Sequence, residues 1–267
     1  MTEGLFAGTL WLMWMDVVDL RDFYQSPLGG VARRMIRRRI RELWPDCKGM
    51  KILGLGYTTP YLGLFKTDAE RTLAFMPAAQ GVLHWPNESR SLTTLVDEAE
   101  LPLDDLSVDR VLIVHAVECS EQLRNLLREV WRVLNGSGKV LIVVPNRTGI
   151  WARMERTPFG LGRPYSPRQL NSLLRDTMFT PLRAERALYV PPSHSRMMLG
   201  SALAWEKVGH KLFPGFAGVC LVEATKQIYA ANPCAPARVK QRRIVALPSR
   251  ESWHVHHKKK KPTLPFL

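Results

Sequence analysis

Short apolar runs alternate along the chain with stretches in which apolar side chains recur at helical spacing. Residues 121–134 and 166–174 show this helical spacing, and the second stretch opens with Ser and Pro, which favour a helix N-terminus. The apolar runs predict seven strands, at residues 50–55, 72–76, 92–96, 110–114, 139–144, 186–190 and 219–225. Strands that alternate with helices are typical of a mostly parallel sheet covered on both faces.

The amino-terminal region precedes this pattern. Residues 31–44 predict an amphipathic helix with arginines between its apolar positions, and residues 27–30 (Pro-Leu-Gly-Gly) are interpreted as a break before it. Asn135-Gly136 is likewise interpreted as a left-handed cap that ends the helix of residues 121–134. We expect three parts: an apolar arm at residues 1–23, a domain at 24–230, and a basic, disordered tail at 231–267.

The formal net charge of +14 suggests an anionic partner, but its distribution leaves a second interpretation open. From Pro233 onward, nine basic residues stand against Glu251 alone, and most of the remaining excess lies in the helix of residues 31–44. The charge therefore indicates either a solvated helix face with a disordered tail, or a surface for nucleic acid or another acidic partner.

The cysteines and histidines suggest neither a disulfide framework nor a metal site. The four cysteines are far apart and form no CxxC pair, which favours a reducing cytoplasm. His254, His256 and His257 have no acid or cysteine at ligand spacing. The longest uncharged stretch near the start, residues 4–15, is shorter than the roughly 20 residues of a membrane-spanning helix, and no cleavable signal peptide is predicted.

Residues 101–118 resemble the middle of the SAM-dependent methyltransferases of the type 11 (ubiquinone-biosynthesis-like) group. They contain a Leu-Pro-Leu turn, an acidic loop, Asp109 beside the fourth predicted strand and Glu118 after it. The resemblance continues in register at residues 127–140, 165–170, 178–179 and 221–226. It implies the Rossmann-like class I methyltransferase fold and S-adenosyl-L-methionine (SAM) as cofactor.

The loop after the first strand departs from that family. Where the family has Leu-Asp-Leu-Gly-x-Gly-x-Gly, Gly54 takes the place of the acid, Gly56 matches, and Thr58 and Pro60 replace the next two glycines. Proline removes a backbone donor and fixes φ, so we expect a loop of different shape. The resemblance assigns cofactor contact to residues Gly54, Leu55, Gly56, Tyr57 and Thr58.

The other cofactor positions are also altered. Met76 stands where the family has the acid that binds the ribose hydroxyls, and a thioether cannot replace that acceptor. Gln80 is the nearest polar substitute. Asp97 or Glu98 can face the adenine amino group, although a solvated turn is an equal alternative.

His115 follows the fourth strand, where substrate-facing groups of this fold lie, so it is a candidate general base or else a histidine of the rim. Glu118 is expected to start the next helix. Residues 151–165 predict a mobile flap whose arginines meet an anionic substrate, or a solvated loop. The apolar helix at residues 197–205 is interpreted as core or dimer contact.

Two functions follow. The first is a SAM-dependent methyltransferase acting on a small molecule or an acidic substrate. The second is a non-catalytic protein of the same fold that binds a protein or nucleic-acid partner through its basic surface.

Overall fold

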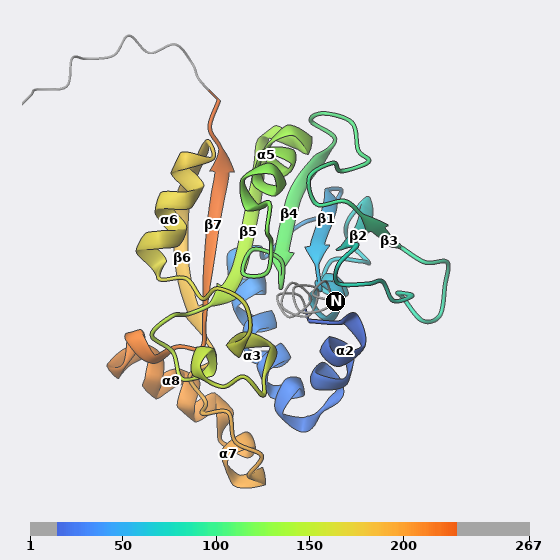
Figure 1. Ribbon diagram of the computed structural model, residues 1–267. Coiled ribbons are helices and arrows are strands. Elements are labelled where there is room, and N and C mark those ends of the chain that lie inside the picture. The colour runs from blue at the N-terminus through green and yellow to red at the C-terminus, as the bar shows by residue number, and fades with distance from the viewer. Residues whose placement is uncertain (1–14, 229–267) are drawn as a thin grey trace, which may run out of the picture. The chain divides into compact units, whose positions relative to one another are not determined.

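The computed structural model describes residues 15–228, which form a seven-stranded sheet with helices on both faces (Figure 1). The strand order is β3-β2-β1-β4-β5-β7-β6, and β7 runs antiparallel to both of its neighbours while the other pairs are parallel. The strands are β1 (Lys51–Gly56), β2 (Arg71–Pro77), β3 (Thr93–Val96), β4 (Val108–Val114), β5 (Leu134–Pro145), β6 (Phe179–Ala187) and β7 (Val219–Lys226). The predicted Rossmann-like fold class is confirmed.

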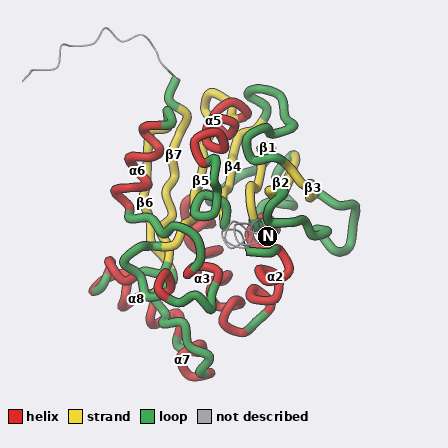
Figure 2. Tube along the Cα trace, in the orientation of Figure 1, coloured by secondary structure: helices red, strands yellow, loops and turns green. Residues whose placement is uncertain are grey.

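Two apolar layers enclose the sheet because alternate side chains of each strand point to opposite faces. Ile52 belongs to the layer under α2 (Val17–Gln25), α3 (Pro27–Leu43) and α4 (Thr59–Leu62). Leu53 belongs to the layer under α5 (Leu123–Val133) and α6 (Pro167–Asp176). Figure 2 shows α2, α3, α5 and α6 together with the strands of the sheet. The insertion between β6 and β7 contains α7 (Arg196–Gly200) and α8 (Ala202–Leu212).

The corner between α2 and α3 corrects the predicted break at residues 27–30. Ser26 caps α3 by accepting a hydrogen bond from the backbone N–H of Gly29 at 3.0 Å, and Pro27 occupies the first helical position. Gly29 is required for packing, because a Cβ atom there would overlap the carbonyl of Phe23. Pro-Leu-Gly-Gly is therefore the first turn of α3. Residues 15–23 of the predicted arm lie mostly in α2, and Val17 and Leu20 are buried.

Three further boundaries differ from the prediction. Asn135-Gly136 is not a helix cap, because β5 begins directly after α5 and Leu134 pairs with Val108. The sixth strand ends at Ala187, and the apolar residues at 188–190 are buried in the loop that follows. The apolar helix at 197–205 is divided at Ser201 between α7 and α8. Its Met197 is 81% exposed, so this side chain is not part of the core.

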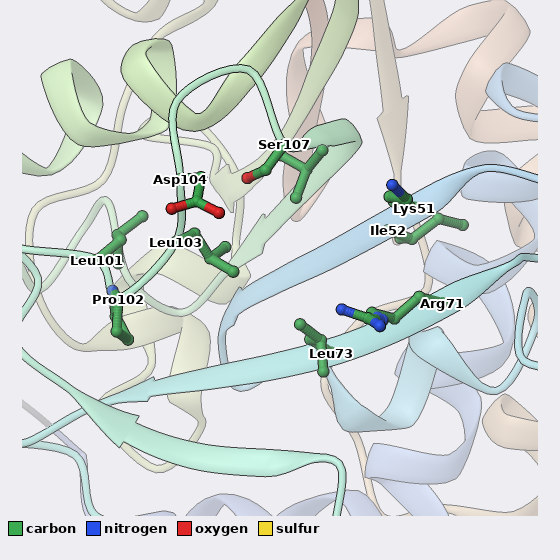
Figure 3. A pocket seen from close by; sticks show the side chains of 10 residues that line it. Lys51, Ile52, Arg71, Leu73, Leu101, Pro102, Leu103, Asp104 and Ser107 are labelled. Carbon is green, nitrogen blue, oxygen red and sulfur yellow. The ribbon is translucent and has the colours of Figure 1, made fainter.

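No helix follows β2 or β3 before the next strand in this described part of the chain. Instead, the loop of residues 97–107 lies near β1 on the face of the sheet that α5 and α6 cover. Arg132 of α5 anchors this loop. Its guanidinium donates to the carbonyls of Leu101 and Leu103 at 2.9 and 2.8 Å and pairs with Glu129 and Asp105. A cavity of about 440 Å³ lies beside this loop, at the amino ends of β1 and β2 (Figure 3).

Candidate functional site

Four aromatic side chains gather where β1 and β4 end. Tyr24 comes from α2, Tyr57 from the turn after β1, Tyr61 from α4 and His115 from the residue after β4. All four are buried, and Tyr24 stacks on Tyr57 with ring centroids 5.6 Å apart. In doubly wound folds this edge of the sheet holds the ligand, so the cluster occupies the expected functional position.

A chain of hydrogen bonds connects these side chains. Tyr61 donates to the hydroxyl of Tyr24 at 2.9 Å, and the hydroxyl of Tyr24 lies 2.8 Å from Nε2 of His115. Nδ1 of His115 lies 3.1 Å from Oε1 of Glu118. If Tyr24 donates to Nε2, a neutral imidazole has its proton on Nδ1 and donates it to the carboxylate, and every contact is satisfied. The four groups therefore form one buried relay.

Two features of the relay are its strained backbone at His115 and its protonated Tyr24 hydroxyl. His115 has φ of 53°, in the left-handed region, and its carbonyl accepts a hydrogen bond from the Gln80 side chain at 3.0 Å. Burial, together with the neighbouring Tyr61, raises the pKa of Tyr24 well above its usual value. The Tyr24 hydroxyl is therefore protonated at neutral pH and available as a donor. Glu118 lies in the turn before α5, so its predicted role as the first residue of that helix is wrong.

The loop after β1 is compact and closed on itself. The amides of Tyr57 and Thr58 donate to the carbonyls of Val114 and Gly56 at 2.9 and 3.0 Å, so neither is free for a ligand. Gly56 has φ of +83°, and a Cβ atom there would overlap the Val114 carbonyl. The space beside Gly54, where the family acid would project, is filled by the Thr58 side chain. The expected difference from the family's loop stays a prediction.

The other residues predicted to contact the cofactor differ in burial and polarity. Leu55 and Met76 are buried among apolar side chains, so neither presents a polar group. Asp97 is exposed and accepts from the amide of Ala99 at 2.8 Å. Glu98 is part-buried, and burial raises its pKa. The structure thus places Gln80 at the relay and the two acids on the turn after β3.

Three buried polar atoms near the relay have no hydrogen-bond partner within residues 15–228. They are Oγ1 of Thr58, Oε1 of Gln80 and Oε2 of Glu118. Burial of an unpaired polar group costs about 1–3 kcal/mol, so native proteins rarely leave several together. These three oxygens are therefore candidate acceptors for a group that donates hydrogen bonds.

The predicted flap is anchored at two aromatic residues. Trp151 and Phe159 are both 1% exposed, and Trp151 donates to the Val190 carbonyl at 2.8 Å. The Phe159 ring centroid lies 5.1 Å from that of His115. The arginines of this segment, Arg153, Arg156 and Arg163, are exposed. The segment therefore covers the relay with apolar rings and directs its charges to solvent.

A cavity of about 530 Å³ opens between α2, α3, α4 and the loop after β2. Tyr24 and Tyr57 form part of its wall, so the relay reaches the cavity at Tyr24. No group of residues that could hold a metal ion occurs between residues 15 and 228, and the same region has no helix long and apolar enough to cross a membrane. The histidines at 254–257 and the basic tail lie outside the described residues.

Residues 54–142 match the family described as "Methyltransferase domain". Among solved structures, a SAM-dependent methyltransferase from Thermotoga maritima is similar, with a TM-score of 0.60 and 16% identity over 82% of this chain and 100% of that chain. A methyltransferase from Haloferax volcanii, solved in complex with the Trm112 activator, has a TM-score of 0.56 and 16% identity. The match covers 80% of this chain and 100% of that chain. A SAM-dependent methyltransferase from Archaeoglobus fulgidus has a TM-score of 0.52 and 21% identity, over 73% of this chain and 94% of that chain.

No curated protein sequence matches the chain. The fold is that of the SAM-dependent methyltransferases, and the family match confirms the resemblance over residues 54–142. The structural similarity, at 21% identity or less, concerns the fold alone.

Sequence reasoning found His115, Gln80 and Glu118 but missed Tyr24 and Tyr61. Tyr24 is 91 residues from His115, and no local pattern links the two. The one available signal was the helical spacing of Val17, Leu20 and Tyr24, which places this tyrosine on the buried face of α2.

Proposed function

We propose that this protein is a SAM-dependent methyltransferase that acts on a small molecule. The observation that carries the proposal is the set of buried, unpaired oxygens that follow β1, β2 and β4 in the chain, contributed by Thr58, Gln80 and Glu118 respectively. All three are acceptors or potential acceptors, which suits a ligand with an ammonium group and hydroxyl donors.

The residues present fit such a cofactor through altered contacts. The carboxylate of Glu118 supplies a buried negative charge for the cofactor's ammonium group. It would take over the role of the acid that the family has at the position of Gly54. Gln80 and Thr58 offer oxygens that accept from the cofactor's hydroxyl groups. They would take over the role of the acid that the family has at the position of Met76. When bound, SAM supplies an activated methyl group, so positioning the acceptor provides most of the catalysis.

The relay gives the chain a route for the acceptor's proton. Tyr24 reaches both the cavity wall and Nε2 of His115. A nucleophile in the cavity that releases its proton to the Tyr24 oxygen lets the hydroxyl proton of Tyr24 move to Nε2. The imidazolium that results faces Glu118, whose carboxylate stabilises it. In this scheme His115 is the general base and acts through Tyr24.

Calorimetry with SAM and with S-adenosylhomocysteine tests the proposal. Thr58→Val replaces the hydroxyl by a methyl group of similar volume and removes an unpaired buried oxygen. We expect its unfolding free energy to stay equal or rise while SAM affinity falls about tenfold, the effect of one lost hydrogen bond of about 1.4 kcal/mol. Glu118→Gln should weaken SAM further, whereas Glu121→Gln, an exposed acid nearby, should not.

The non-catalytic alternative is favoured by one observation, the filled space beside Gly54. Absence of heat for both ligands at 1 mM would support that alternative and refute the proposal. Unchanged SAM affinity in Thr58→Val and Glu118→Gln would refute the assignment of these contacts.

A further inference from the structure

The cavity between α2, α3 and α4 has a one-sided charge. Arg21, Arg33 and Arg37 line it, and no Asp or Glu does. Arg21 pairs with exposed Asp22 at 2.9 Å, whereas Arg33 and Arg37 form no ion pair with any residue from 15 to 228. Two arginines thus face an open volume without a counter-charge.

Arg33 and Arg37 differ from the two arginines that follow Arg37 in the same helix in having no carboxylate partner among residues 15–228. The next two residues of α3 point to other sides of the helix, and there Arg38 and Arg39 both pair with Glu42, at 3.0 and 2.6 Å. Arg33 and Arg37 are four residues apart on one helix face, where like charges repel. Partial burial, with Arg41 and Arg33 nearby, lowers the pKa of Arg37. Their arrangement costs stability that an anion in the cavity would recover.

The rest of the wall suits a flat ring. Tyr57 and Trp85 contribute aromatic surface, and Gln25 and Asn87 contribute amide groups. The volume of about 530 Å³ lies within the range of about 300–1,000 Å³ typical of small-molecule sites. Paired guanidinium groups bind phosphate and carboxylate oxygens in a forked geometry, which adds directional specificity.

We propose that this cavity binds a small aromatic anion, with its phosphate or carboxylate group against Arg33 and Arg37 and its ring against Tyr57 and Trp85. The site goes beyond the proposed function and does not depend on it, because anion binding requires neither SAM nor methyl transfer. If methyl transfer occurs as proposed, Tyr24 in the same wall makes the bound anion a candidate methyl acceptor.

A calorimetric titration tests the site: 1-naphthyl phosphate is added to the full-length protein at low salt, and the heat of binding is measured. 1-Naphthol and inorganic phosphate supply the ring and the anion separately. We expect naphthyl phosphate to bind more tightly than either, and added salt to weaken it because salt screens the charges. SAM binding is measured on the same samples, so failure of one proposal is distinguishable from failure of the other.

Arg37→Gln and Arg34→Gln form a matched pair on α3. Arg37 lines the cavity, whereas Arg34 is exposed and does not line it, and each change removes one positive charge. We expect Arg37→Gln to weaken naphthyl phosphate at least tenfold and Arg34→Gln to change it less than twofold, with thermal unfolding confirming that both variants fold. Equal losses in the two variants would overturn the proposal, as would equal affinity for 1-naphthol or no binding of naphthyl phosphate at 1 mM.

Discussion

The direction of the relay makes two conservative substitutions unequal. Tyr24→Phe removes a hydroxyl that contacts both His115 and Tyr61, and therefore leaves two buried polar atoms unpaired. At about 1–3 kcal/mol for each, the expected loss of unfolding free energy is about 2–6 kcal/mol. Tyr61→Phe removes one donor and leaves the contact of Tyr24 with His115 intact, so we expect a loss of only about 0.5–1.5 kcal/mol.

Urea unfolding followed by circular dichroism measures these losses. The double variant Tyr24→Phe/Tyr61→Phe also removes the unpaired Tyr61 hydroxyl, so it should be no less stable than Tyr24→Phe alone. Denaturant slopes should agree among the variants, which would indicate comparable unfolded states. Equal losses in the two single variants, or additive losses in the double variant, would refute the assigned donors and acceptors.

Three other results are expected. Arg132→Ala should lower stability by roughly 2–4 kcal/mol because two loop carbonyls and Glu129 lose a partner, whereas Arg128→Ala, on the exposed side of α5, should change it by less than about 0.5 kcal/mol in the same urea assay. Hydrogen bonding from Arg132 lowers the pKa of Glu129, so its stabilisation is present above the unfolded value of about 4.3 and is lost as the pH falls through the folded pKa. Glu129→Gln should therefore flatten the acid limb of a plot of urea midpoint against pH, and an unchanged limb would contradict this assignment. Gly54→Ala should lower the melting temperature, and adding Thr58→Ala should restore part of the loss; a restoration of nothing would show that Thr58 is not the obstacle.

The sequence predicted strands well where burial is complete and less well where it is not. All residues of the predicted fourth strand lie in β4, because its apolar run is buried on both faces. The edge strand β6 contains Thr180, Arg183 and Glu185 and has no apolar run, so its position was misplaced toward the buried loop after it. Pro27 and Gly29 were interpreted as a break because their capping and packing depend on Ser26 and Phe23 in three dimensions.

The candidate site was less predictable than the fold for the same reason. His115 and Glu118 could be chosen from their place after the fourth strand, since the resemblance supplied that place. Tyr24 joins them only because α2 folds back over the carboxyl end of β4, and contacts between distant segments have no local pattern in the sequence. Arg33 and Arg37 were noticed as charge, but the cavity that distinguishes them from Arg34 exists only in the folded chain.

The filled space beside Gly54 has a consequence for how this chain can change over time. An acid at that position would collide with Thr58 and with Leu62, whose methyl group lies 2.6 Å from the place of a Cβ atom. Introducing the acid that the family has at this position therefore needs at least two substitutions, because Gly54→Asp alone gives a strained protein. Single substitutions at Gly54 are therefore disfavoured, so adaptation by single steps proceeds more readily through other positions around the relay.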